Sequence, residues 1–152
     1  MKIRSLQRAD YGPCFALLKE FAQEIGNRDL ILENPDVKHI YRILLRCEIS
    51  TASFVAEHDR TIQGMILALV SPDIWFPNQF RISELAWFVR PEYRHTTMGA
   101  RLFHHYEKSA QNQVKSGKIR GCTISKLANS PDFDYEKRGF EFVEATYQQG
   151  AR

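Results

Sequence analysis

The sequence predicts a mixed α/β or α+β sheet covered by helices, and three observations lead to that prediction. The length of 152 residues is typical of one domain, so we expect residues 1–152 to form a single domain. The first half contains a strong hairpin signal. The second half has the strand–helix–strand pattern of a parallel unit. The expected element order is β-α-α-β-β-β-α-β-α-β.

The chain is expected to open with a short strand over Met1–Leu6 and two helices. Asp10 is expected to cap the first helix, whose apolar residues keep helical spacing up to Gly26. The second helix is expected to begin at Asn34-Pro35, because proline favours the first helical position. The apolar stripe of the second helix comprises Val37, Ile40, Leu44 and Cys47.

A hairpin and an exposed loop follow in the sequence. Apolar and β-branched residues fill Ser53–Glu57 and Ile62–Val70, and the polar turn His58–Arg60 separates them. This pattern predicts two antiparallel strands. Ser71–Gln79 holds two prolines and the pair Trp75-Phe76, which predicts a loop with an aromatic tip.

The second half starts with a third long strand, Arg81–Arg90. A helix over Gly99–Lys115 and a strand over Ile119–Ser125 are expected next. A single helical turn over Asp134–Arg138 and a last strand over Phe140–Ala145 complete the order. The inner face of the long helix is expected to hold Leu102, Phe103, Tyr106, Ala110 and Val114.

The composition excludes several classes of protein. The net charge of +3 is too small to make nucleic acid an expected partner. No apolar run approaches the roughly 20 residues of a spanning helix, so no membrane partner is expected. With no signal-peptide pattern, a cytoplasmic location is expected. Cys14, Cys47 and Cys122 form no CxxC pair and are expected to be free thiols, and no metal site is expected.

One segment is locally basic. Between Arg90 and Arg120 there are seven Lys or Arg residues and two acidic ones, a net charge of +5. Such a field suits an anionic ligand, and it is equally consistent with a solvated helix face.

Within that segment a strand end, a polar loop and a helix start meet, over Val89–Leu102. A helix N-terminus has free N–H groups that bind phosphate, and Gly99 and Ala100 would allow a ligand to approach the backbone. Arg94 and Arg101 would add positive charge. The alternative is an ordinary connection between a strand and a helix.

The same stretch resembles the acetyl-CoA signature of the GNAT family of N-acetyltransferases. The residues that match are Val89, Pro91, Arg94, Gly99 and Leu102, whereas Thr97 replaces the first glycine. Downstream, Tyr135–Phe140 (Tyr-Glu-Lys-Arg-Gly-Phe) is similar to a second family motif. The opening Ile3-Arg4 strand and Arg8–Asp10 are similar to the family's N-terminal start. The resemblance therefore covers nearly the whole chain and implies a central, mixed, mostly antiparallel sheet flanked by helices.

The resemblance implies transfer of an acetyl group from acetyl-CoA, as cosubstrate, to a primary amine of a small molecule or protein. The amine would attack directly in a ternary complex. Glu84 would act as the base and Tyr135 would protonate the departing thiolate. The expected acetyl-CoA contacts are Phe88, Val89, Arg90, Arg94, His95, Thr96, Thr97, Met98, Gly99, Ala100 and Asn129.

Three departures from the family pattern leave alternatives open. Thr97 disfavours the positive φ that glycine allows, so the loop either avoids that conformation or binds more weakly. The offset of Glu84 from Val89 is one residue short of the common pattern, which a β-bulge would restore. Asn129 also lies one residue off the usual spacing. The alternative function is a catalytically decayed acyl-CoA-binding or protein-interaction module of the same fold.

The acceptor is poorly specified. In this fold the acceptor groove is expected to be bordered by Asn27–Asn34 and by Trp75, Phe76 and Phe80. The aromatic residues would pack an amine or a peptide, form a dimer contact, or cap the edge of the core. Asp29, Glu33 and Asp73 would attract a cation. A homodimer is expected because members of the family often dimerise.

Overall fold

The computed structural model describes residues 1–26, 34–127 and 132–147, and its centre is a five-stranded sheet. The strands lie across the sheet in chain order: β1 (Lys2–Ser5), β2 (Phe54–His58), β3 (Thr61–Pro72), β4 (Phe80–Val89) and β5 (Gly121–Thr123). β1 to β4 pair antiparallel, and β5 pairs parallel to β4. The mixed, mostly antiparallel sheet predicted from the sequence is therefore confirmed.

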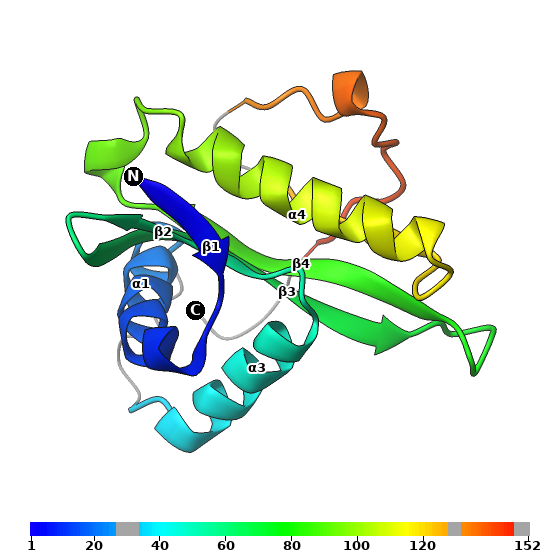
Figure 1. Ribbon diagram of the computed structural model, residues 1–152, viewed down its shortest axis with the longest axis horizontal. Helices are drawn as coiled ribbons and strands as arrows, with labels where there is room; N and C mark the ends of the chain where they lie inside the picture. The colour runs from blue at the N-terminus through cyan, green and yellow to red at the C-terminus, as the bar shows by residue number, and fades with distance from the viewer. Residues whose placement is uncertain (27–33, 128–131, 148–152) are drawn as a thin grey trace.

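Helices cover both faces of the sheet (Figure 1). α1 (Tyr11–Glu24) and α3 (Val37–Ile49) lie on one face, and α4 (Met98–Lys115) lies on the other. The described residues also form three short 3₁₀ turns: η1 (Arg8–Asp10), η2 (Pro91–Tyr93) and η3 (Glu136–Arg138). In the part of the chain that the structure describes, no helix is long and apolar enough to cross a bilayer.

Two apolar clusters hold the layers together because β3 is buried on both of its faces. Ile66 and Ala68 pack with Phe103 and other side chains of α4, whereas Met65 and Leu67 pack in the cluster that α1 and α3 cover. All four β3 side chains are fully buried. Alternate side chains of a strand point to opposite faces, so one continuous apolar strand serves both layers.

The predicted hairpin between β2 and β3 is confirmed, and its turn has the expected handedness. Asp59 and Arg60 adopt left-handed φ values of 48° and 63°. Two consecutive positive φ values are those of a type I′ turn, whose twist matches that of the flanking strands.

α1 begins directly after Asp10, as predicted, whereas α3 begins slightly later than predicted. Asp10 does precede α1, but its carboxylate does not cap that helix. It accepts the Gln7 N–H at 2.9 Å and pairs with Arg4 at 2.7 Å, which fixes η1 against β1. The α3 cap is Asp36 rather than the predicted Asn34-Pro35 pair, because the Asp36 side chain accepts the His39 N–H.

The predicted inner face of α4 is correct except at Val114, which is 41% exposed. Gln113 is buried in its place, because it continues the helical spacing from Tyr106 and Ala110. Its amide N–H groups donate to the Ser50 carbonyl and to the Thr51 hydroxyl, so polar partners replace apolar ones at this end of the core.

The prediction of a strand over Phe140–Ala145 is wrong, and the strand predicted over Ile119–Ser125 is shorter. Phe142 and Val143 are each 75% exposed. A strand requires a ladder partner, and among the described residues none pairs with this segment. β5 ends early because the Ser125 N–H binds a side chain, Glu84, instead of extending the ladder. The predicted turn before Phe140 is confirmed as η3.

Candidate active site

The sheet forks where β4 and β5 separate. Arg81, Ile82 and Ser83 of β4 pair with Gly121, Cys122 and Thr123 of β5. β4 then continues to Val89, and on that side it has no partner strand among the described residues. The outward N–H and C=O groups of this half of β4 are therefore available to an extended ligand that carries amide groups.

A β-bulge at Leu85 determines which way the side chains of β4 point. Ala86 pairs with Leu67 and Glu84 pairs with Ala68, so Leu85 is the extra residue. Without it, Glu84 would share a face with Ala86, which packs beneath α1 and α3. With it, Glu84 shares the α4 face with Trp87. This is the bulge that the spacing of Glu84 and Val89 required.

Glu84 lies at the fork and is partly buried. Its Oε2 accepts the N–H of Ser125 at 3.2 Å, just beyond the end of β5. Burial raises the pKa of Glu84 to about 7, although the hydrogen bond from Ser125 opposes that rise. A carboxyl with a pKa near neutrality is suited to accept and release a proton at physiological pH.

Tyr135 packs on the same side of the sheet as Glu84. Its ring lies 5.1 Å from that of Phe133 and 6.0 Å from that of Phe103 between centroids. Burial, and then the negative charge of Glu84, raise the pKa of the Tyr135 phenol, so it stays protonated. Arg138 holds η3 against α4 through a 2.9 Å ion pair with Glu107.

The loop before α4 has an open helix N-terminus. Thr97 has φ −77° and ψ 3°, so the loop avoids the left-handed conformation at the position where the family has glycine. The Thr96 hydroxyl donates to the Tyr93 carbonyl and accepts the Met98 N–H. The N–H groups of Gly99 and Ala100 donate to no acceptor in the described ranges. These groups can bind a phosphate oxygen.

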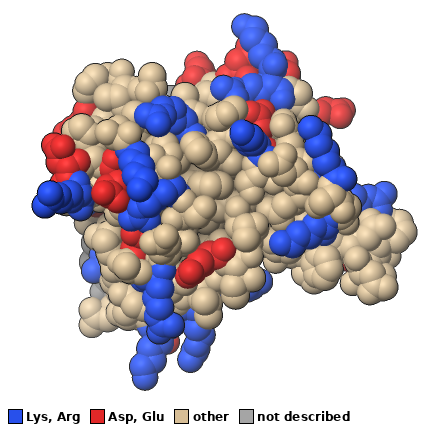
Figure 2. Space-filling view, viewed as in Figure 1, with Lys and Arg blue, Asp and Glu red and all other residues tan. Residues whose placement is uncertain are grey.

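Two arginines of the predicted acetyl-CoA site are paired with α1. Arg90 makes a bidentate ion pair with Glu20, the shortest contact being 2.8 Å. Arg94 pairs with Glu24 and also donates to the Val89 carbonyl at 2.8 Å. In Figure 2, acidic and basic groups are intermixed at this end of the molecule. The local basic field is therefore weaker than the count of charges predicts.

Of the other predicted acetyl-CoA contacts, some are buried and some are exposed. Phe88 (4%), Val89 (8%) and Met98 (0%) are buried, so their side chains do not face a ligand. Within the protein, the Met98 N–H already binds the Thr96 hydroxyl and the Val89 carbonyl accepts from Arg94. His95 is exposed beside the loop. Asn129 lies outside the described residues.

The predicted acceptor residues are not gathered at the fork. Trp75 and Phe76 lie at the tip of the β3–β4 hairpin, and four residues of strand, about 13 Å, separate Phe80 from Glu84. Asp73 pairs with Arg81 at 3.0 Å, so its charge is not available to attract an acceptor. Residues 27–33, with Asp29 and Glu33, lie outside the described residues.

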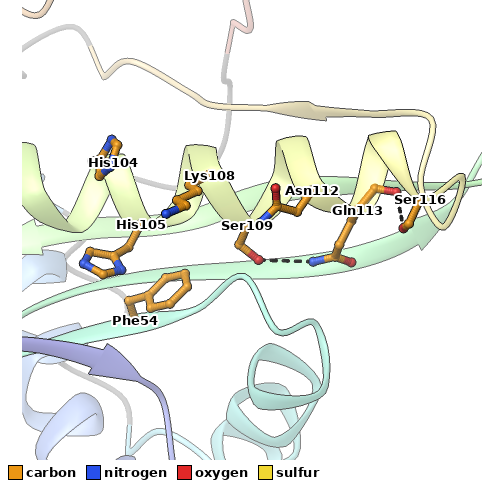
Figure 3. Close-up of a pocket in the computed structure, with 8 residues that line it drawn as sticks. All are labelled: Phe54, His104, His105, Lys108, Ser109, Asn112, Gln113 and Ser116. Atoms are coloured by element: carbon orange, nitrogen blue, oxygen red, sulfur yellow. Dashed lines mark hydrogen bonds between the residues drawn. The ribbon is translucent and has the colours of Figure 1, made fainter.

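A separate shallow groove runs along α4 beside Phe54 (Figure 3). His105 packs against Phe54 with ring centroids 5.4 Å apart, and burial and nearby positive charges lower its pKa. Ser109 and Gln113 tie α4 to the turn after α3. None of the predicted catalytic residues lines this groove, whose lining is Phe54, His104, His105, Lys108, Ser109, Asn112, Gln113 and Ser116.

Two residues at the fork are parts of the site that the sequence does not indicate. Ser125 binds the Glu84 carboxylate through its backbone N–H, so its side-chain type carries no signal. Tyr106 is predicted only as a core residue, yet its hydroxyl donates to the Thr123 carbonyl at 2.5 Å and fixes the end of β5 to α4. Both contacts depend on the register of β4 and β5.

Comparison with known families and structures agrees with this fold. Residues 22–151 match the acetyltransferase (GNAT) domain. No curated protein matches the chain. A predicted acetyltransferase from Clostridium acetobutylicum, solved with acetyl-CoA, is 14% identical over 98% of this chain and 95% of its own (TM-score 0.69). An aminoglycoside acetyltransferase from an uncultured soil metagenomic sample, solved with sisomicin, is 18% identical over 97% of this chain and 95% of its own (TM-score 0.63).

A third similar structure is the ribosomal-protein-alanine N-acetyltransferase of Brucella melitensis, 15% identical over 97% of this chain and 98% of its own (TM-score 0.61). At these identities the likeness shows the fold. The family match spans most of the sequence and defines the chain as an acetyltransferase. More particularly, the chain belongs to the GNAT family.

Proposed function

We propose that this chain transfers the acetyl group of acetyl-CoA to a primary amine, of a small molecule or a protein, by direct attack in a ternary complex. The proposal rests on the location of Glu84 at the fork of the sheet. A partly buried carboxyl with a pKa of about 7 lies where β4 leaves β5, beside an unpaired strand edge. The structure solved with acetyl-CoA shares this fold, which supports the choice of donor.

The open half of β4 and the start of α4 fit the two polar parts of acetyl-CoA. The free edge from Glu84 to Val89 would pair with the pantetheine amides. The N–H groups of Gly99 and Ala100 would bind the pyrophosphate. When bound, acetyl-CoA supplies an activated thioester carbonyl, and an N–H of β4 would polarise it.

Glu84 and Tyr135 would move the two protons of the reaction. Glu84 accepts a proton from the acceptor ammonium, directly or through a water, so that the free amine can attack. The new C–N bond forms, the C–S bond breaks, and Tyr135 donates its phenolic proton to the departing thiolate. The second proton that the nitrogen loses as it becomes an amide restores the phenol of Tyr135. The raised pKa of Tyr135 keeps that proton available near neutral pH.

A panel of amines tests the proposed reaction. With acetyl-CoA as donor, release of free CoA thiol is measured with lysine, an N-terminal alanine peptide and an aminoglycoside as acceptors. At least one is expected to release thiol in equal amount to an acetylated amine identified by mass spectrometry. Thiol release with no acetylated amine from any acceptor would mean simple hydrolysis and would contradict amine transfer.

Thr97 is expected to be compatible with acetyl-CoA binding. Its φ of −77° suits any residue, and its side chain makes no capping bond, so Thr97→Gly should lower the free energy of unfolding by less than about 1 kcal/mol. The dissociation constant for acetyl-CoA should change less than about threefold, because a change of that size is below 1 kcal/mol. Calorimetric titration and thermal unfolding measure the two effects.

The neighbouring threonine is the matched control. Thr96→Ala removes two hydrogen bonds at the start of α4 and should cost about 1 kcal/mol of stability. If Thr97→Gly instead tightened acetyl-CoA binding tenfold or more, Thr97 would be an obstacle in the site.

A further inference from the structure

The loop between β3 and β4 carries three large apolar side chains outside the core. Ile74 is 86% exposed, Trp75 79% and Phe76 46%. The loop projects at one end of the long axis of the molecule (Figure 1). Single exposed apolar residues are common on protein surfaces, but three in succession at a projecting tip form a patch that marks a contact surface.

The backbone beneath these side chains is well ordered by polar bonds. The Asp73 carboxylate accepts the N–H groups of Trp75 and Phe76, at 2.8 and 3.2 Å, and pairs with Arg81. The Asp73 N–H donates to the Gln79 carbonyl at 2.7 Å and closes the loop. The tip therefore keeps its shape without burying its apolar side chains, which are held outward.

Basic side chains border the tip. Arg120 lies over the Phe76 ring at 4.6 Å and donates to Gln79, which brings the turn after α4 against the loop. Lys115 and Lys118 are exposed in the same turn region, and neither makes an ion pair within the described ranges. In Figure 2 the tip is a tan lobe with Lys and Arg groups beside it. The carboxylate of this loop, Asp73, is already paired with Arg81.

We propose that this tip inserts into the surface of an anionic lipid bilayer, with Ile74 and Trp75 among the headgroups and Lys118 and Arg120 against acidic lipids. Tryptophan and phenylalanine favour the membrane–water interface, and each lysine or arginine near an anionic surface adds attraction. The expectation of no membrane partner rests on the absence of spanning segments in the sequence, and insertion of a surface loop requires none.

The shape of the tip favours a bilayer over another protein. A stable protein interface buries about 800 Å² on each partner, far more than two side chains and part of a third provide. A convex tip also needs a matching cavity in a protein partner. A bilayer interface needs no such match and combines apolar insertion with charge attraction.

Co-sedimentation of the whole chain with vesicles tests this proposal. The protein is expected to sediment with vesicles of phosphatidylcholine and phosphatidylserine, to bind phosphatidylcholine vesicles much less, and to lose binding as salt rises. The double variant Ile74→Ser/Trp75→Ser and the variant Lys118→Glu should each bind about tenfold more weakly. Ile49→Ser, which alters a 66% exposed isoleucine at the end of α3, is the matched control and should bind normally.

Tryptophan fluorescence gives a second measurement. Trp87 is partly buried and stacked on Phe103, whereas Trp75 is 79% exposed, so a blue shift of emission on adding anionic vesicles should arise from Trp75. Trp75→Phe should lose the shift while it still sediments with the vesicles.

Four outcomes would overturn the proposal. The first is wild-type protein that stays in the supernatant with anionic vesicles at low salt. The second is sedimentation that Ile74→Ser/Trp75→Ser leaves unchanged while circular dichroism shows the variant folded. The third is a blue shift that persists in Trp75→Phe. The fourth is wild-type self-association that the double variant abolishes without lipid, which would identify the tip as an interface between copies.

Discussion

Replacement of Glu84 by Gln is expected to lower kcat by about 10²- to 10⁴-fold, because it removes the group that accepts the ammonium proton. The side-chain amide of the variant keeps an oxygen for the Ser125 N–H, so the fork should stay intact. The pH profile separates a base from a merely structural residue. In the wild type, kcat should rise with pH through about 7, the pKa of Glu84, and level off above it. The variant should lack that limb.

The same substitution should stabilise the protein at alkaline pH. The pKa of Glu84 is higher in the folded chain than its ordinary value of 4.5, so folding binds a proton between about pH 4.5 and 7. The free energy of unfolding should therefore fall as pH rises through that range. Above pH 7, Glu84→Gln should be more stable than the wild type, by on the order of 1–3 kcal/mol.

Glu141→Gln, at an exposed carboxylate, is the matched control and should change neither kcat nor stability. If Glu84→Gln kept full activity with an unchanged pH profile, Glu84 would not be the base. Thermal unfolding at pH 5 and pH 8 and initial rates over the same range provide both readings.

Replacement of Tyr135 by Phe is expected to lower kcat by about 10²-fold and to leave KM for acetyl-CoA unchanged, because the proton donor for the thiolate is lost. The ring contacts with Phe103, Phe133 and Phe140 remain, so the melting temperature should hardly change. Stopped-time assays of thiol release and a thermal unfolding curve measure the two effects.

Tyr147→Phe removes the same hydroxyl from a tyrosine that is 94% exposed, and it should be silent. A Tyr135→Phe variant with wild-type kcat would assign Tyr135 to the core alone. A Tyr135→Phe variant that lost activity and also melted at a much lower temperature would argue for a structural role of the Tyr135 hydroxyl.

The order of elements up to β5 could be predicted because its signals are local. The polar turn at Asp59-Arg60 and the apolar spacing of α4 each depend on neighbouring residues. The strand predicted over Phe140–Ala145 failed because a strand also needs a partner, and its own residues do not specify one. Gln113 is buried where Val114 was predicted to be, because polar partners on the turn after α3 bind the Gln113 amide.

The site could be predicted in part. The motif residues located the strand end and the helix start, and the short spacing between Glu84 and Val89 pointed to a bulge, which lies at Leu85. The ion pairs of Arg90 and Arg94 with α1 could not be predicted, because they join residues 70 positions apart. The contact of Ser125 with Glu84 depends on where β5 ends, which no local pattern indicates.

Binding of acetyl-CoA by the fork between β4 and β5 and the open start of α4 is tested by calorimetric titration of the whole chain with acetyl-CoA, and with CoA and ATP for comparison. Acetyl-CoA and CoA are expected to bind at one site per chain. ATP, which lacks the pantetheine arm, is expected to bind much more weakly. Binding of none of the three, or equal binding of ATP and acetyl-CoA, would contradict binding at this site.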